Sequence, residues 1–518
     1  MTDEHTNPRV LIVTPEVTYL PPNMGNMANY LTAKAGGLAD VSAALVSSLF
    51  DLGADVHVAI PDYREIFHHQ LAPVIGKELM MIRNKMPEDR IHLAEDRAFF
   101  YMNRVYSSYG DENIKIALAF QREVINNIIP RVRPHLIHCN DWMTGLIPAV
   151  SRRMRIPCLF TVHNIHTVKC PLSYIEDRGI DAAYFWEHLY YQHMAVEYEE
   201  SRENNPVDFL VSGIFAAHFV NTVSPSFLRE IVEGRHHFVE WPLRQELTNK
   251  YNADCAVGIL NAPDPAFRPQ SDENLAERYA PETHAQGKRK NKLHLQHTLG
   301  LTENVSAPLF FWPHRLDPIQ KGCQILAEVL YRCVSRYWDD NLQMVFVANG
   351  DYQGVFRDIV AFHDLHNRIA VCNFDERLAR LAYGASDFML MPSRFEPCGL
   401  PQMIAPIYGS LPVAHDTGGI HDTVSHLNVE RSSGNGFLFE VYDSNGLMWA
   451  IDEAMRFYRL PESVRRRQIE RIMRESAHCF THAVTARDYM ALYEKMLQRP
   501  LITSTGFPEA LEAAAPRV

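Results

Sequence analysis

Residues 386–424 read SDFMLMPSRFEPCGLPQMIAPIYGSLPVAHDTGGIHDTV, and this stretch decides the fold. The apolar run Phe388–Met391 predicts a buried strand, which breaks at Pro392 and gives way to a loop that contains Glu396. A helical segment, a second strand over 411–414 and a Thr-Gly-Gly loop that opens another helix follow. This order is typical of an open α/β sheet, which presents ligand-binding residues where its strands end.

The same rhythm extends in both directions along the chain. Short apolar runs alternate with helical patterns such as 38–52 and 114–129, the second ended by Pro130, which predicts parallel sheets covered by helices on both faces. A polar stretch over 264–292 is predicted to be a linker followed by a surface helix. We therefore expect two doubly wound domains. The predicted strands are 10–14, 56–60, 136–139, 158–162, 219–223 and 256–260 before this stretch, and 308–313, 344–348, 369–372, 388–391, 411–414 and 437–439 after it.

The composition is that of an ordinary globular protein. The 518 residues are 47% apolar and 22% charged, and the net charge of −12 argues against general affinity for nucleic acids. Nine cysteines indicate free thiols in a reducing compartment, because none form a C-x-x-C pair. No leader pattern and no apolar run of about 18 residues is present. We expect a cytoplasmic protein that binds no membrane.

Two Gly-Gly loops stand at the start of predicted helices, one in each half of the chain. KAGGLADV occupies 34–41, and DTGGIHDTV occupies 416–424. Glycine lets backbone N–H groups approach a ligand closely, and a helix N-terminus favours an anion or polar oxygens. A plain tight turn is the alternative interpretation of each loop.

Two cations follow the predicted strand 308–313. Arg315 and Lys321 flank a Leu-Asp-Pro turn, and Gly322 follows. Such cations suit a diphosphate whose negative charge grows as a bond breaks. A surface loop with two solvated cations fits these residues equally well.

Polar residues also follow two strands of the first half. His138 and Asp141 lie at the end of one strand, and His163 lies at the end of the next. They suit hydroxyl orientation or acid–base chemistry, although Asp141 also suits a helix N-cap. His166 adds a third histidine, but no H-x-H or H-x-x-x-H spacing with a carboxylate is present. We predict no metal site.

Glu396 and Cys398 are the reactive groups of the opening stretch. A carboxylate at a strand end can accept two sugar hydroxyls, and a buried helix cap is the alternative for Glu396. Cys398 has no histidine nearby in the sequence to make it a thiolate. We interpret Cys398 as a small residue that lines a pocket.

Together these segments resemble the bacterial glycogen synthase and plant starch synthase family of retaining glycosyltransferases. The resemblance implies a GT-B fold, in which two Rossmann-like doubly wound parallel-sheet domains face a cleft, without metal or cofactor. We expect an N-terminal domain over 1–262, a nucleotide-sugar-binding domain over 263–480, a helix over 481–500 that packs back on the first domain, and a disordered tail over 501–518. The matching segments are KAGGLADV (34–41), HCNDWMTGL (138–146), TVHN (161–164), NTVSPSF (221–227), GILNAPD (258–264), RLDPIQKG (315–322), MPSRFEPCGLPQ (391–402) and DTGGIHDTV (416–424).

The resemblance implies a role for individual residues. Lys34 would face the donor's diphosphate and sugar, while Arg315 and Lys321 would neutralise the departing diphosphate. Glu396 would hold the 3- and 4-hydroxyls of glucose. The implied catalytic residues are Lys34, Asp141, His163, Arg315, Lys321 and Glu396, and the implied substrate-binding residues are Gly36, Gly37, Asn261, Phe374, Cys398, Gly399, Leu400, Thr417, Gly418 and Gly419.

The remaining implied roles concern the sugar, the phosphate and the base. Asp141 and His163 would line the glucosyl site, His163 through its backbone carbonyl or its ring. The Gly399 and Leu400 amides would bind phosphate. Phe374 stands where the family usually has a tyrosine stacked on adenine, and any aromatic face suffices for stacking.

The reaction implied is transfer of glucose from ADP-glucose, or UDP-glucose, to the non-reducing 4-hydroxyl of an α-1,4-glucan with retention at the anomeric carbon. Front-face attack assisted by the departing phosphate is favoured, because the sequence offers no obvious second nucleophile. Two alternatives stay open. One is a GT-B nucleotide-sugar glucosyltransferase with another acceptor, and the other is a non-catalytic glucan-binding protein.

The chain departs from the family at several points. An insertion that includes PPNMGNMANYL precedes Lys34, and the segment from Arg315 to Lys321 is one residue longer than usual. The family's HNLAYQG is HNIHTVKC here, NGID is NAPD, and CGLT is CGLP, which removes a hydroxyl near the phosphate. These departures predict retained donor chemistry and leave the acceptor open.

Overall fold

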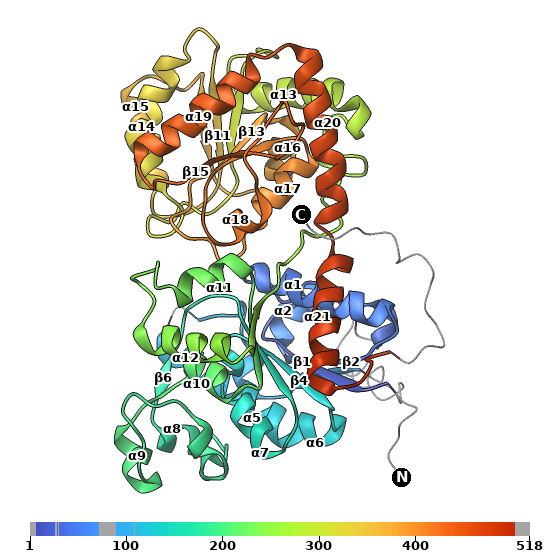
Figure 1. The fold of residues 1–518 in the computed structure, drawn as a ribbon, viewed down its shortest axis with the longest axis vertical. Coiled ribbons are helices and arrows are strands. Elements are labelled where there is room, and N and C mark those ends of the chain that lie inside the picture. The colour runs from blue at the N-terminus through green and yellow to red at the C-terminus, as the bar shows by residue number, and fades with distance from the viewer. Residues whose placement is uncertain (1–6, 26–27, 29–30, 72–89, 108, 503–518) are drawn as a thin grey trace. The chain divides into compact units, whose positions relative to one another are not determined.

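The computed structural model describes residues 7–25, 28, 31–71, 90–107 and 109–502 (Figure 1). Parts of the insertion before Lys34 and the tail over 503–518 lie outside the described residues. The chain divides into two compact units. Unit 1 contains Met1–Val223, Ile231–Ile259 and Thr485–Val518, and unit 2 contains Ser224–Glu230 and Leu260–Val484. The domain boundaries expected from the sequence stay a prediction, and they did not foresee that the short segment Ser224–Glu230 packs with unit 2.

Unit 1 is built on a fully parallel seven-stranded sheet. Its strand order is β3-β2-β1-β4-β5-β8-β9, so the order reverses between β1 and β4. In an open α/β sheet, ligands bind at the carboxyl ends of the strands that flank such a reversal. The strands are β1 (Arg9–Val13), β2 (Asp55–Pro61), β3 (Ile91–Ala94), β4 (Leu136–Asn140), β5 (Cys158–Val162), β8 (Phe219–Thr222) and β9 (Ala256–Gly258), with an antiparallel pair β6 (Lys169–Cys170) and β7 (Val207–Asp208) beside the sheet.

The central strands of this sheet consist mostly of apolar residues, which are buried when helices cover both faces of the sheet. The helices of this part of the chain are α1 (Gly37–Asp51), α2 (Arg64–Leu71), α4 (Arg97–Phe100), α5 (Gly110–Glu123), α6 (Ile129–Val132), α7 (Ile147–Arg153), α8 (Leu172–Glu176), α9 (Tyr198–Asn204), α10 (Phe209–Ala216), α11 (Pro225–Val232) and α12 (Trp241–Asn252).

Unit 2 repeats the architecture with a parallel six-stranded sheet. Its order β12-β11-β10-β13-β14-β15 reverses between β10 and β13. The strands are β10 (Leu309–Trp312), β11 (Gln343–Val347), β12 (Ile369–Cys372), β13 (Phe388–Met391), β14 (Leu411–His415) and β15 (Phe437–Phe439). The helices of this part of the chain are α13 (His284–Leu299), α14 (Cys323–Arg336), α15 (Gln353–Phe362), α16 (Glu376–Ala385), α17 (Pro401–Ile407), α18 (Gly418–Thr423), α19 (Ser444–Tyr458), α20 (Glu462–Cys479) and α21 (His482–Leu497), the last of which lies mostly in unit 1.

The surface helix predicted after the polar stretch is present as α13, with one face exposed and the opposite face buried. The buried Lys288 Nζ donates to the Tyr408 carbonyl at 2.9 Å, and burial lowers the pKa of Lys288 to about 7. Lys292 is also buried and pairs with Asp387 at 2.6 Å. Buried polar groups persist where each finds a partner. Because these partners lie about a hundred residues away in the sequence, the polarity of the segment itself could not show that this face of the helix is buried.

Three smaller predictions about this fold were wrong. The helical segment does not end at Pro130, since a π-helical turn over Val124–Ile128 leads into α6, where proline occupies the first turn. The strands β3, β6 and β7 were not foreseen. The predicted disordered tail does not begin at 501, because Leu501 is fully buried and its amide donates to Glu494.

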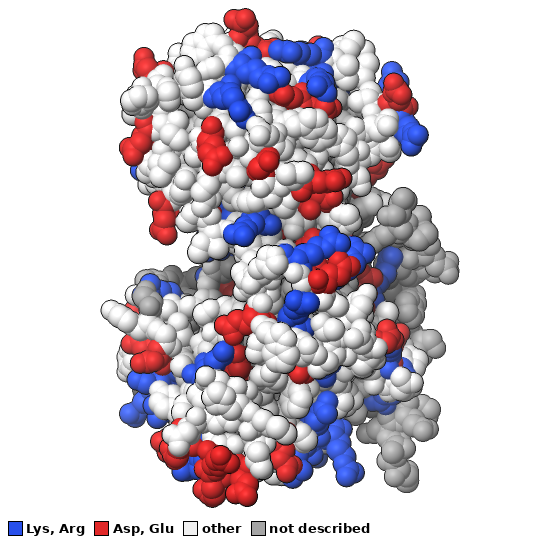
Figure 2. Space-filling model, turned by 60° about the vertical axis from the view of Figure 1, so that its left-hand side comes forward, with Lys and Arg blue, Asp and Glu red and all other residues white. Residues whose placement is uncertain are grey.

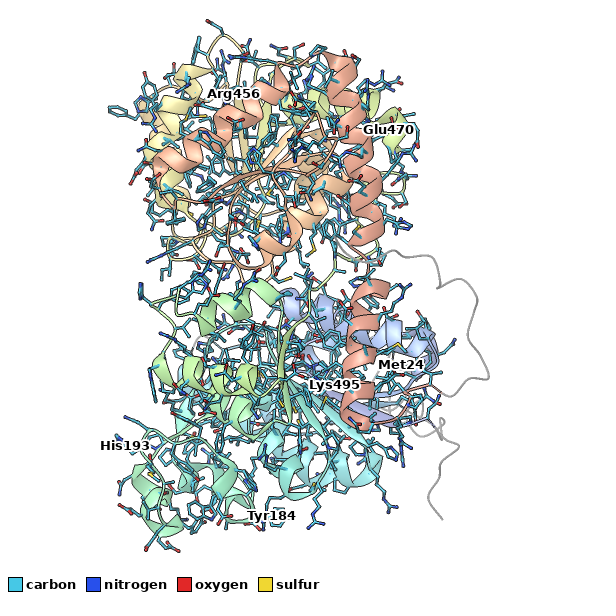
Figure 3. The ribbon with its side chains drawn as sticks, in the orientation of Figure 1. Met24, Tyr184, His193, Arg456, Glu470 and Lys495 are labelled. Atoms are coloured by element: carbon cyan, nitrogen blue, oxygen red, sulfur yellow. The ribbon has the colours of Figure 1, made fainter. Side chains whose placement is uncertain are left out.

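The last helix, α21, packs on the sheet of unit 1. The Tyr493 hydroxyl lies 2.7 Å from His138 Nδ1, and the Tyr489 hydroxyl accepts from Asn221 Nδ2 at 3.0 Å. Lys495, labelled in Figure 3, pairs with Asp254 at 2.8 Å. His138 is thereby buried under this helix, with its other nitrogen 2.6 Å from the Thr161 hydroxyl. It serves the packing of the helix.

Charge on the surface is mixed. Basic and acidic side chains are interspersed over the face shown in Figure 2. Within the described ranges, each helix is either too short or too polar to span a lipid bilayer.

Candidate active site

The Lys34 loop follows β1 in unit 1 and leads into α1. The Lys34 side chain is 51% exposed, and its Nζ lies 2.8 Å from Asp40 Oδ2 on the first turns of α1. A Cβ built on Gly36 or Gly37 meets no atom within 4 Å, so the space beside both glycines is open. The loop therefore presents an ammonium group beside open space.

A carboxylate that the sequence interpretation missed holds this loop. Glu16 Oε2 accepts the amides of Ala35 at 2.6 Å and Gly36 at 2.9 Å, and Oε1 accepts the Tyr106 hydroxyl at 3.1 Å. Burial raises the pKa of Glu16, while the two amides lower it. The position of Glu16 just after the first strand could have indicated a site residue. The insertion between Glu16 and Lys34 separates the two in the sequence, so their contact was not expected.

Asp141 lies at the end of β4, beside the reversal point of the sheet. It is buried with φ of 57°, and its carboxylate accepts the His163 amide at 2.7 Å and Asn164 Nδ2 at 3.0 Å. It occupies the N-cap position of the 3₁₀ turn Trp142–Thr144, as the N-cap interpretation expected, but its side chain makes no capping hydrogen bond. Burial raises the pKa of Asp141 to about 7, the two hydrogen bonds lower it, and the charge of Glu16 raises it further.

His163 follows β5, the next strand of the sheet. Its Nε2 lies 3.0 Å from Asn140 Oδ1, and burial lowers the pKa of the ring to about 3. The imidazole is therefore neutral at physiological pH, with Nε2 donating to the amide oxygen. Asp141 and His163 thus form one rigid pair, whereas His166 lies apart and packs edge-on against Trp142.

In unit 2, the chain segments after β10 and β13 bring Lys321 and Glu396 together. Lys321 Nζ lies 2.5 Å from Glu396 Oε2, which also accepts the Ser393 hydroxyl at 3.1 Å. Both partners are buried, with 8% and 5% of their surface exposed. A buried ion pair of this kind is costly to break, because removing one partner leaves the other charge uncompensated. Arg315, on the same strand end as Lys321, is exposed.

The Thr-Gly-Gly loop after β14 packs directly on the Glu396 loop. The Gly419 amide donates to the Glu396 carbonyl at 2.9 Å, and the Gly418 amide donates to Glu230 Oε1 at 2.8 Å. Thr417 Oγ1 donates to the other oxygen of Glu230 at 3.2 Å. These amides are therefore engaged within the protein, and the loop supports Glu396.

Cys398 lies within this packed region. It is buried, and burial raises the pKa of its thiol to about 12, while a hydrogen bond from the Asn261 backbone lowers it. Asn261 Oδ1 is buried and finds no hydrogen-bond partner among the described residues. A neutral thiol makes Cys398 unsuited to nucleophilic attack at physiological pH.

Three more predicted residues lie near these strand ends. Gly399 adopts φ of 76°, which favours glycine, and Leu400 is the N-cap of α17. Phe374 follows β12 with 57% of its surface exposed, so its ring is accessible for stacking. The structure thus gathers the predicted residues into two groups, one at the strand ends of each unit. Among the described residues, no cluster of three His, Cys, Asp or Glu side chains is arranged to hold a metal ion.

Comparison with known proteins identifies the family. Residues 9–244 match the starch synthase catalytic domain, and residues 307–456 match the glycosyl transferases group 1. The glycogen synthase of Exiguobacterium sibiricum is 32% identical over 489 residues, which covers 89% of this chain and 95% of that protein. The chain belongs to the glycogen synthase family. The glycogen synthase of Moorella thermoacetica, another relative, is 31% identical over 518 residues.

Solved structures show that the glycogen synthase fold is kept. The catalytic domain of starch synthase IV from Arabidopsis thaliana, bound to ADP and acarbose, superimposes with a TM-score of 0.74 at 23% identity. It covers 95% of this chain and 100% of its own. A sucrose-phosphate synthase from Thermosynechococcus elongatus matches more weakly, with a TM-score of 0.54. The two Rossmann-like units are those of a GT-B glycosyltransferase.

Pro401 is a departure from the glycogen synthase family that the structure explains locally. It stands at the first position of α17, where the missing N–H would lack a helical partner in any case. Gln402 Nε2 donates to the Cys398 carbonyl at 2.8 Å and to Thr423 Oγ1 at 3.2 Å, which holds the loop in place. Loss of the hydroxyl therefore leaves the backbone of this loop intact.

Proposed function

We propose that this chain is a retaining glucosyltransferase that moves glucose from ADP-glucose, or UDP-glucose, to the non-reducing 4-hydroxyl of an α-1,4-glucan. The observation that carries the proposal is the buried Lys321–Glu396 pair at the reversal point of the unit 2 sheet. The relatives named glycogen synthase support it, as does the starch synthase IV structure with its bound ADP and acarbose.

The donor's diphosphate is assigned to cations and loop amides. Negative charge grows on the diphosphate as the bond to the anomeric carbon breaks, and fixed positive groups stabilise that charge best. Arg315 supplies an exposed guanidinium, and Lys321 has ammonium hydrogens beyond the one that binds Glu396. We assign the phosphate to the Gly399 and Leu400 amides and the adenine to the exposed face of Phe374.

The glucosyl unit is assigned to two carboxylates and a histidine. Glu396 accepts the 3- and 4-hydroxyls, while Asp141 and His163 line the anomeric side. The acceptor's 4-oxygen forms the new bond to the anomeric carbon on the face from which the diphosphate leaves. The bond electrons pass to the diphosphate oxygen, which takes the proton of the acceptor hydroxyl. Cys398, as a neutral thiol, forms no covalent intermediate.

A transferase with a different acceptor is the second candidate, and one observation favours it. The segment that replaces the family's HNLAYQG contains Lys169, which pairs with Glu240 at 3.2 Å and with Asp208 at 3.5 Å. A charged, ion-paired side chain there alters the chemistry offered to an acceptor. The third reading, a non-catalytic glucan-binding protein, is disfavoured because Lys34, His163 and the buried Lys321–Glu396 pair are all present.

Radiolabel incorporation tests the proposal. Purified protein is given labelled ADP-glucose or UDP-glucose with glycogen, with maltooligosaccharides, or without primer. We expect label in glycogen from at least one donor and little without primer. No transfer and no donor hydrolysis under any condition would refute glucosyltransferase activity, while transfer to other acceptors alone would favour the second candidate.

The cytoplasmic location and the domain boundaries at 262, 480 and 500 also stay proposals. Limited proteolysis with mass detection tests the boundaries, since exposed linkers between folded units are cut first. Fractionation of cells that produce the protein tests the location.

A further inference from the structure

Glu16 is a buried carboxylate of unit 1 that was not among the residues predicted from the sequence. It follows β1 and is 2% exposed, and three groups donate to its two oxygens, namely the amides of Ala35 and Gly36 and the Tyr106 hydroxyl. Hydrogen bonds to a carboxylate are about twice as strong as neutral ones. Glu16 therefore acts as an internal anion bound by the glycine loop.

The bound carboxylate changes what the loop can offer to a ligand. The amides of Ala35 and Gly36 are engaged, so they do not cradle the donor. The Lys34 ammonium, paired with Asp40, and the first turn of α1, which begins at Gly37, remain on the open side. The position of Lys34 is thus set by how firmly Glu16 holds the backbone of the two residues that follow it, Ala35 and Gly36.

The backbone beneath Glu16 is itself fixed. The Tyr63 hydroxyl donates to the Pro15 carbonyl at 2.9 Å, and Thr14 Oγ1 donates to the Glu16 carbonyl at 3.0 Å. Both donors are buried. A carboxylate anchored in this way fixes the position of the Lys34 loop relative to the end of β1.

Tyr106 is affected by the charges of both Glu16 and Asp141. The charges of Glu16 and Asp141 both raise the pKa of the Tyr106 phenol, after the larger effect of burial. The hydroxyl therefore stays protonated and donates to Glu16 at 3.1 Å. The charges of Glu16 and Asp141 therefore act on the same hydroxyl.

We propose that Glu16 is a positioning residue for glucosyl transfer, which holds Lys34 in register with the Asp141–His163 pair by binding the Ala35 and Gly36 amides. This rests on the proposed function. Glu16 touches no substrate in this scheme, and its effect acts through Lys34. Gln can still accept both amides after rotation of its amide group, whereas Ala accepts neither.

A double-mutant cycle tests the proposal. We expect Glu16→Ala to lower kcat about 100-fold with a smaller change in KM for the donor, because a displacement near 1 Å costs that much. Glu16→Gln should restore most of the rate. In a Lys34→Ala background, Glu16→Ala should cost little more. Asp96→Ala is the matched control, because Asp96 accepts the Ala98 amide at 2.7 Å elsewhere in unit 1, and its effect should be equal in both backgrounds.

Equal costs of Glu16→Ala in the two backgrounds would overturn the proposal, as would a rate loss that Glu16→Gln does not restore. Hydrogen exchange of the Ala35 and Gly36 amides is measured in parallel and should be faster in Glu16→Ala than in wild type and Asp96→Ala. If Glu16→Ala fails to fold, the cycle is run with Tyr106→Phe, which should show the same dependence on Lys34 at smaller size. Wild-type protein without transfer would refute the proposed function, and unchanged exchange would then refute the loop anchor separately.

Discussion

The two Gly-Gly loops look alike in sequence and differ in what their glycines do. In unit 1, a Cβ on Gly36 or Gly37 would enter open space. In unit 2, a Cβ on Gly418 would lie 2.1 Å from the Glu396 carbonyl oxygen, and one on Gly419 would lie 2.0 Å from that of Cys398. Gly418 also has φ of 47°.

The two loops nevertheless share one feature, a buried glutamate that binds the loop backbone. Each loop gives amides to a buried glutamate, Glu16 in unit 1 and Glu230 in unit 2. The glutamate fixes the loop in both cases, but the glycines serve opposite needs. In unit 1 they keep space clear beside Lys34, and in unit 2 they allow backbone to pack against backbone. The second arrangement supports Glu396, and under the proposed function the first leaves room for the donor.

Gly419→Ala should produce the largest effect, because the atom it would meet is a backbone carbonyl that cannot rotate away. We expect a loss on the order of 3 kcal/mol in the free energy of unfolding, measured by chemical denaturation, together with loss of activity. Gly354→Ala in α15 is the control, since its Cβ meets nothing within 4 Å, and it should leave stability unchanged or slightly raised. Equal stability of the two variants would contradict the close packing of the unit 2 loop at Gly419.

Gly37→Ala should separate activity from stability. Alanine suits the first turn of α1, so the melting temperature should stay at the wild-type value or rise slightly. The added methyl group enters the open space beside Lys34, and kcat/KM for the donor should fall about 10- to 100-fold. A stability loss similar to that of Gly419→Ala would show that both loops are packed in the same way.

Asp141→Asn should remove a pH dependence that belongs to unit 1. Because the pKa of Asp141 is raised to about 7, the carboxylate forms only above that pH, and kcat/KM should fall about tenfold per unit below it. The folded protein retains the proton longer than the unfolded chain does, so this group lowers stability as pH rises from about 4 to 7. The variant should lack both trends, which pH–rate profiles and denaturation across that range would measure. A persistent acidic limb near 7 in the variant would assign it to another group.

Cys398→Ser should have the smallest effect. The Gly419 site packs against the carbonyl of Cys398, not its sulfur, and the neutral thiol attacks nothing. Transfer assays should show a rate close to wild type. Loss of activity with intact folding would contradict the assignment of Cys398 as a lining residue.

Sequence reasoning located the strand ends well. β5, β12, β13 and β15 have the predicted bounds, and the other central strands differ by a residue or two, because continuous apolar runs between turn signals are a local property. The residues that follow those strands, from Asp141 to Glu396, were therefore placed at the correct edge of each sheet. Nothing near His138 in the sequence indicates that α21 covers it.

The two alternating halves, the order of the loops and the membership in the glycogen synthase family can be predicted from the sequence, because periodicity and motif order depend on neighbouring residues. The partner of each loop amide, in contrast, is set by the folded chain. Glu16, Glu230 and the carbonyl of Glu396 receive these amides across long sequence separations. Two glycine pairs that read alike were distinguished by what lies beside them, and a hydrogen-bond partner or a close backbone contact exists only once distant segments meet.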